Sequence, residues 1–205
     1  MDSTAQNAFA VDVTRMAKLA FGDETRRVKS ALSFWLLNSE LHCVACYRFG
    51  QAAREIRRRN KLVGSAMLAV YKIWNRWVTH FHHTIIHPGA RIGPGFLLMH
   101  RHGVLIGPSE IGANVVVHQN VTIGQRVAGG DQTMPRIGDN VWIGPGAIIS
   151  GAITVGDGAT ISAGAVLSKS VLPRTLVAGN PARVIANDYD NSRMLNIPEA
   201  KGKSS

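Results

Sequence analysis

From residue 86 onward, apolar residues recur at every sixth position, and this period restricts the fold more than any other feature of the sequence. Glycine often follows the recurring residue, and a small or β-branched residue often lies four positions after it. The recurring residues are Ile86, Ile92, Leu98, Leu105, Ile111, Val117, Ile123, Ile137, Ile143, Ile149, Val155, Ile161 and Leu167. Strands have a period of two and helices a period of 3.6, so neither explains the pattern. Six-residue repeats predict a parallel β-helix, in which each repeat forms one side of a triangular coil.

Two interruptions of the period mark segments that leave the regular coil. The first adds one residue after Leu98, and His100 and His102 lie within this insertion. The second adds about eight residues, Arg126–Met134, which must form an extruded loop. The period is lost at Pro173.

The sequence divides into three parts of different character. Residues 1–84 are predicted to form an N-terminal helical arm, and residues 85–186 a β-helix domain closed by the segment Gly179–Ile185. Residues 187–205 are polar and are predicted to form a flexible tail. The expected fold is therefore mainly β, with an α-helical arm before the coil.

The arm is predicted to be helical and carries most of the positive charge. The expected helices are Val11–Phe21, Val28–Arg59 and Leu62–Val78. Gly50 is a candidate break point in the second helix. Residues 25–80 hold eleven Lys and Arg against two acidic residues, a net +9 within a total of +10. A basic segment with Trp74 and Trp77 favours a membrane surface or an anionic partner, and a solvated helix face is the alternative. The sequence shows no nucleic-acid reading motif, so we expect no nucleic-acid partner.

Four stretches resemble the hexapeptide-repeat acyltransferases. They are Ile86–Gly93, Met99–Gly103, Val121–Gly124 and Gly179–Arg183. Within that superfamily the pattern is similar to the serine O-acetyltransferases, and closest to their relatives of the colanic-acid type that acetylate exopolysaccharides. The resemblance implies a left-handed parallel β-helix and a homotrimer. It also implies that acetyl-CoA binds in the groove between subunits and that its acetyl group passes to a hydroxyl.

His100 is the candidate catalytic base, from its place in the insertion and from the resemblance. A hydroxyl attacks slowly while it is protonated, and a neutral imidazole can remove that proton near pH 7. His102 is a candidate second base or acceptor-binding donor. His118 either faces the cleft or is a plain turn residue. No covalent nucleophile is evident, so we expect direct attack on the thioester. The resemblance places acetyl-CoA against Gly124, Gln125, Pro145, Ala163, Lys169 and Arg183, the last two as partners of its phosphates.

Departures from the serine acetyltransferase pattern predict an uncharged acceptor. Ile85 and Met99 stand where that family has Asp, and Thr133-Met134 stands where its loop has Arg-His. A small zwitterion needs charged partners, which these residues cannot supply. We therefore expect a carbohydrate acceptor, such as an exopolysaccharide precursor. Serine O-acetyltransferase and a non-catalytic β-helix scaffold are the alternatives.

Composition excludes several other classes of protein. Two cysteines cannot form a disulfide framework, and Cys43 and Cys46 have no second pair with which to bind zinc. The N-terminal residues do not form a signal peptide, and no run of about 18 apolar residues predicts a membrane span. We expect a cytoplasmic enzyme without a metal, in peripheral contact with the inner membrane through the basic segment Arg54–Lys61.

Overall fold

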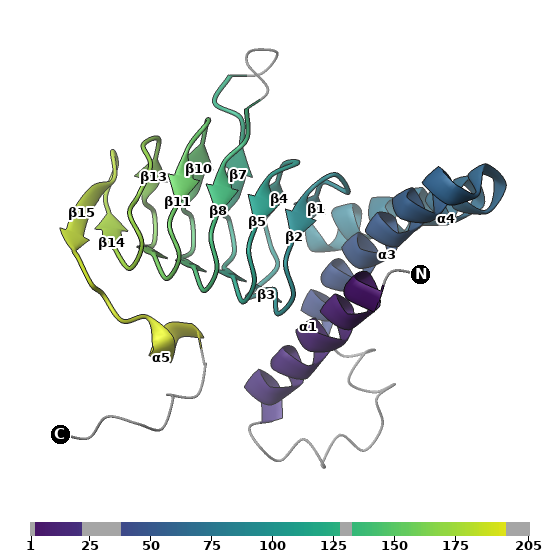
Figure 1. Ribbon diagram of the computed structural model, residues 1–205, viewed down its shortest axis with the longest axis horizontal. Helices are drawn as coiled ribbons and strands as arrows, with labels where there is room; N and C mark the ends of the chain where they lie inside the picture. Colours follow the sequence, from purple (N-terminus) through teal and green to yellow (C-terminus); the bar gives the residue numbers. More distant parts are fainter. Residues whose placement is uncertain (1–2, 22–37, 128–132, 196–205) are drawn as a thin grey trace.

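The computed structural model describes residues 3–21, 38–127 and 133–195, and three sheets of short strands dominate it (Figure 1). Sheet A contains β1 (Ile85–Ile86), β4 (Leu105–Ile106), β7 (Thr122–Gly124), β10 (Ile148–Ser150) and β13 (Val166–Leu167). Sheet B contains β2 (Arg91–Ile92), β5 (Glu110–Ile111), β8 (Arg136–Ile137) and β11 (Thr154–Val155). Sheet C contains β3 (Leu97–Leu98), β6 (Val116–Val117), β9 (Trp142–Ile143), β12 (Thr160–Ile161), β14 (Leu176–Ala178) and β15 (Arg183–Ala186).

The chain visits sheets A, B and C in turn, and each strand pairs in parallel with the strand of the next coil, as Ile106 pairs with Ile123. Only β15 departs from this rule among the described strands, because it pairs antiparallel with β14 and ends the stack. The parallel β-helix predicted from the six-residue period is therefore confirmed.

The inward-facing side chains stack into one buried core. The predicted inward orientation is wrong for one residue, Leu105. Leu105 points outward and is 41% exposed, whereas its neighbour Ile106 is fully buried. Ile106 lies eight residues after Leu98 and five before Ile111, so the insertion holds two residues and the following side is one residue short. The segment from Leu98 to Ile111 is only one residue longer than two regular repeats, because two residues are added and one is missing. Its length therefore predicted a single extra residue.

The outward faces of the coil differ in polarity. Face A is the outward side of sheet A, made by Ile85, Leu105, Thr122, Ile148 and Val166. Four of these five residues are apolar, and three of them are at least 40% exposed. The outward side of sheet B carries charges instead, since Arg91 and Arg136 pair with Glu110 at 3.5 and 3.3 Å. The apolar character of face A requires an explanation.

The outward side of sheet C is partly covered by both terminal segments. Helix α1 (Ser3–Phe21) packs against β3. The short helix α5 (Ser192–Leu195) is held by Arg15, which donates to the carbonyls of Leu195 (2.7 Å) and Gly95. Asn191 donates to the carbonyl of Asn140 at 3.0 Å. Residues up to Leu195 thus pack on the coil, where the sequence predicted a frayed tail, and residues 196–205 lie outside the described residues.

Besides α1, the arm contains a hairpin of two long helices, α3 (Ser39–Arg59) and α4 (Lys61–His82). The predicted helix Val28–Arg59 begins instead at Ser39, because Asn38 is extended and its side chain accepts from the Leu41 N–H at 2.8 Å. Residues 28–37 lie outside the described residues. Helix α3 continues through Gly50, where a Cβ would lie 2.6 Å from the Tyr71 ring of α4. Gly50 therefore permits close packing of the two helices and does not break the first.

A buried ion pair joins α1 to α3, and both of its side chains also bond the backbone of the first coil. Arg48 of α3 donates to the carboxylate of Asp12 in α1 at 2.9 Å, and both side chains are buried. The same guanidinium donates to the carbonyls of Ile92 and Gly93, each at 2.7 Å, and Asp12 accepts from the Phe96 N–H. These bonds fix α1 and α3 on the first coil. No helix among the described residues is long and apolar enough to span a membrane.

Candidate active site

The corners between sheets C and A stack into one edge of the coil, which carries two candidate histidines. We call residues 99–104, 118–121, 144–147 and 162–165 the histidine edge. Its first corner has six residues between strands, and the next three have four each. The two extra residues bulge from the coil, and His100 lies in this bulge with a left-handed backbone (φ 55°). The insertion thus exposes the His100 side chain at the surface.

His118 lies one coil further along the same edge, with its ring centroid 6.4 Å from that of His100. Its half-buried ring packs 4.9 Å from the Trp142 ring. Burial lowers the pKa of His118, and the nearby His100 lowers it further. His118 is therefore neutral at pH 7 and offers one donor and one acceptor. At this separation, both imidazoles can contact one small group bound between them.

His102 has different surroundings from His100. Its exposed ring lies 6.3 Å from the ring of His83, which precedes the first strand. Its backbone carbonyl accepts from the Asn120 N–H at 2.8 Å, so the backbone here follows the regular stack. The structure therefore groups His100 with His118, and His102 with His83. The role of His102 as a second base stays a prediction.

Arg101 fastens the bulge to the helical arm. Its Nε donates to Nδ1 of His82 at 2.9 Å, and its guanidinium lies 3.4 Å from the carboxylate of Glu40. Its backbone carbonyl accepts from the Thr84 hydroxyl. Both helices thus hold the turn that carries His100. Sequence reasoning missed this network, because its members are up to 61 residues apart and share no motif.

The predicted acetyl-CoA residues lie on two different edges. Pro145 and Ala163 lie on the histidine edge. Gly124, Gln125 and Lys169 lie at the corners between sheets A and B, which we call the loop edge (residues 107–109, 124–127, 133–135, 151–153 and 168–170). Arg183 lies apart in β15. The two edges border face A from opposite sides, so one protomer does not bring the predicted set together.

Both edges suit an extended ligand that is held by backbone groups. A Cβ at Gly124 or Gly164 would meet no atom within 4 Å, so the backbone is open there. Ala163 is exposed beside Gly164. Small residues of this kind let a chain such as pantetheine approach the backbone N–H and C=O groups. These positions therefore fit acetyl-CoA.

The four residues from which we expected an uncharged acceptor lie at different places on the coil. Ile85 is exposed on face A, and Met99 packs against the core. Thr133 is exposed and Met134 half-buried at the loop edge, and residues 128–132 of the predicted loop lie outside the described residues. The exposed Arg126, at the start of that loop, is a cation that the sequence argument overlooked. Arg126 lies outside the positions at which the family pattern has charges, so a comparison of those positions does not reveal it.

The pair of cysteines does not form part of this site. Cys43 and Cys46 are buried in α3, and burial raises the pKa of each thiol to about 12. Both thiols are therefore protonated and unreactive at neutral pH. Among the described residues, no group of three or more His, Cys, Asp and Glu could hold a metal ion.

Comparison with known proteins agrees with this geometry. Residues 134–169 match the family model described as bacterial transferase hexapeptide (six repeats). The chain is 34% identical over 167 residues to the serine acetyltransferase of Bacillus licheniformis, covering 81% of this chain and 73% of that protein. It is 48% identical over 113 residues to serine acetyltransferase 3, mitochondrial, of Arabidopsis thaliana, covering 55% of this chain and 29% of that protein. The soybean serine acetyltransferase complexed with serine superposes with a TM-score of 0.69 at 34% identity, covering 90% and 70%.

The chain belongs to the serine acetyltransferase family. Two expectations are thereby corrected. The serine acetyltransferase relatives contradict the carbohydrate acceptor, and they do not support closeness to the exopolysaccharide enzymes. The aligned segment spans less than half the length of the Arabidopsis thaliana and Escherichia coli serine acetyltransferases, 29% and 41%. The error arose because missing charges at a few matched positions were taken to exclude charges from the whole site.

Proposed function

We propose that this chain is a serine O-acetyltransferase, which transfers the acetyl group of acetyl-CoA to the hydroxyl of L-serine. The observation that carries the proposal is the 34% identity to the Bacillus licheniformis serine acetyltransferase, which extends over 81% of the chain. The exposed His100 beside a neutral His118 supplies a suitable base. We propose for the coil the left-handed sense of the family fold.

In the proposed reaction, His100 accepts the proton of the serine hydroxyl as its oxygen attacks the thioester carbon. The carbon–sulfur bond then breaks, and the CoA thiolate leaves and recovers the proton from the imidazolium. General-base assistance of this kind contributes roughly 10²–10⁴-fold to the rate. His118, neutral and 6.4 Å away between ring centroids, donates a hydrogen bond to the reacting group.

The serine carboxylate requires a cation, and we propose Arg126. This residue is exposed on the loop edge, directly after Gln125. Guanidinium groups bind carboxylates through two parallel hydrogen bonds. Arg126 thus supplies the charge that Thr133 and Met134 lack.

We also propose a homotrimer, with face A at the subunit contact. The histidine edge and the loop edge border face A on opposite sides, so contact through this face brings one edge of each subunit toward its neighbour. A site that uses both His100 and Arg126 is completed in this way. Three residues of face A (Ile85, Leu105 and Ile148) are exposed apolar side chains that the contact removes from water.

The test is the release of CoA thiol from acetyl-CoA by the purified protein, with L-serine compared with a panel of nucleotide sugars. We expect turnover with L-serine. The Arg126→Gln variant should raise KM for serine at least ten-fold, because it removes the partner of the carboxylate. Turnover with a sugar but not with serine would contradict the proposal.

A further inference from the structure

The solvent side of α4 carries apolar residues that remain exposed among the described residues. Leu62, Val70, Ile73, Trp77 and Phe81 are all exposed, and Ile73 is 74% exposed. Their spacing of three, four and eight residues places them on one face of the helix. The rings of Trp77 and Phe81 lie 4.9 Å apart within this stripe. Trp74, by contrast, turns inward and packs 5.9 Å from Phe49 of α3.

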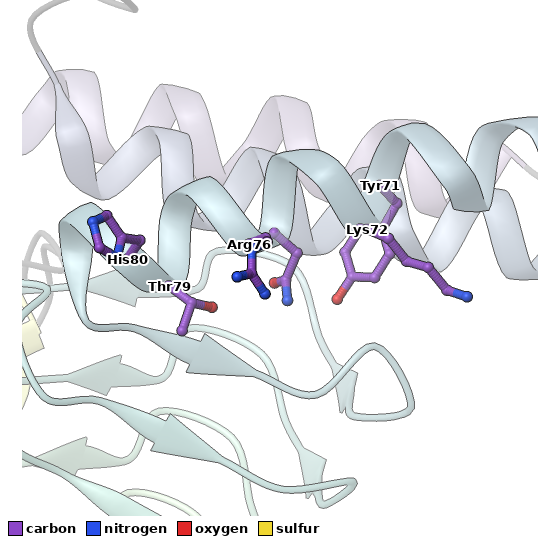
Figure 2. Close-up of a pocket in the computed structure, with 6 residues that line it drawn as sticks. Tyr71, Lys72, Arg76, Thr79 and His80 are labelled. Carbon is purple, nitrogen blue, oxygen red and sulfur yellow. The ribbon is translucent and has the colours of Figure 1, made fainter.

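Basic residues run along α4 beside the apolar stripe. Lys72, Arg76 and His80 follow one another every fourth residue and line one side of the helix (Figure 2). With Tyr71 and Thr79 they border a pocket of about 440 Å³. Lys72 and Arg76 are cations, His80 offers an imidazole N–H donor, and Tyr71 and Thr79 bring hydroxyl donors. The pocket therefore suits a phosphate group.

The charge of the whole hairpin has the same sign. Residues 39–82 contain eight Lys and Arg against two Glu, a net +6, and α4 itself contains no acidic residue. Arg57, Arg58 and Arg59 at the end of α3 and Lys61 at the start of α4 place further cations at the tip. An apolar face with flanking cations and aromatic residues is typical of helices that lie in the interface of a membrane.

We propose that α4 docks on the surface of an anionic phospholipid bilayer. The stripe from Leu62 to Phe81 enters the boundary between headgroups and acyl chains, and Lys72, Arg76 and His80 face the lipid phosphates. A second copy of the chain is a poorer occupant, because a two-fold contact through α4 sets the same cations against each other without an acid to neutralise them. This inference is independent of the acceptor and of His100.

Flotation of the full chain with vesicles tests the proposal. We expect the protein to float with vesicles of equal parts phosphatidylglycerol and phosphatidylcholine, but not with pure phosphatidylcholine, and to be released by high salt. The Ile73→Glu variant should lose at least ten-fold in binding. Its matched control is Leu172→Glu, because Leu172 is also 74% exposed but lies on the coil. This control should bind as the unmodified chain does.

The contribution of charge is tested separately. The double variant Lys72→Gln/Arg76→Gln should lose roughly five-fold in binding for each cation removed. Its control, Arg91→Gln/Arg174→Gln, removes two exposed arginines of the coil and should bind normally. All four variants should keep their transferase activity in solution.

Four results would overturn the proposal. The first is no flotation with anionic vesicles, and the second is equal flotation of the Ile73→Glu variant. The third is a change in oligomeric state caused by Ile73→Glu, measured by light scattering, which would show that a second copy covers the stripe. Loss of transferase activity in a variant that stays folded would place α4 in the active site and would also contradict independent membrane docking.

Discussion

His100 and His102 are two positions apart, yet their rings have different neighbours. The His100 ring faces His118, while the His102 ring faces His83. We therefore expect His100→Ala to lower kcat by roughly 10²–10⁴-fold and His102→Ala to lower it by less than ten-fold. Steady-state kinetics with acetyl-CoA and L-serine measures both. Equal losses in the two variants would show that the ring neighbours do not decide which imidazole is the base.

The buried His82 and the half-buried His118 also make stability depend on pH. Burial lowers the pKa of His82 and of His118 from the ordinary value of 6.5. As the pH falls below about 6.5, the unfolded chain binds protons that the folded chain does not, so the free energy of unfolding decreases. We expect the Tm to fall as the pH is lowered from about 7.5 to about 5.5. The fall should be smaller in His118→Gln, and an equally steep fall would contradict this assignment.

The bulge in the first corner of the histidine edge depends on the arm. The Arg101 side chain is only 22% exposed. It donates a hydrogen bond to His82 of α4 and forms an ion pair with Glu40 of α3. We expect Arg101→Met to lower stability by about 1–3 kcal/mol, because it leaves the partly buried Glu40 without this cation. It should also lower kcat, since the turn that carries His100 becomes less fixed. Thermal unfolding and kinetics measure the two effects.

The matched control for Arg101 is Arg91→Met. Arg91 pairs with Glu110 at 3.5 Å, but its side chain is 81% exposed, so the pair contributes little to stability. This variant should change both stability and kcat only slightly. A loss of stability as large as that of Arg101→Met would mean that burial does not determine how much each ion pair contributes to stability.

At the level of elements, the six-residue period predicted the coil because each inward residue contributes to one continuous core. It did not identify Ile106 as the inward-facing residue. The two-residue insertion before Ile106 is followed by a side that is one residue short, so the spacing does not show where the repeat shifts. The helix start at Ser39 was also missed, because the Asn38 cap competes with a periodic apolar pattern that continues before it. Docking of Asn191 and Leu195 depends on partners more than thirty residues away, which local patterns do not reveal.

For the site, the sequence indicated His100 because an insertion in a regular repeat is visible without a structure. It could not indicate His118 as a neighbour of His100, because the contact depends on which corners stack. It also gave no sign that Gly124 and Ala163 lie on opposite sides of face A. Periodicity assigns a residue to a side of the coil only while the repeat is regular, and both His100 and Arg126 lie at interruptions of the repeat.

At the level of the whole molecule, the three outward faces have separate roles. The chain's own termini partly cover sheet C, and the Arg91–Glu110–Arg136 ladder keeps sheet B in solvent. Face A remains as an apolar surface between the two edges that we assign to the site. If the trimer forms through this face, assembly and activity depend on the same side chains.

Ile148→Asp tests that dependence. Ile148 lies on β10, next to the central strand of sheet A, and is 40% exposed, so a charge there should leave the isolated fold intact but disfavour a contact that buries it. We expect light scattering to show a trimer for the unmodified chain and a monomer for the variant, with kcat reduced at least ten-fold although His100 is unchanged. Thr154→Asp, on the outward side of sheet B, should remain trimeric and active. A fully active Ile148→Asp monomer would show that one protomer holds a complete site, and the two edges would then need no neighbour.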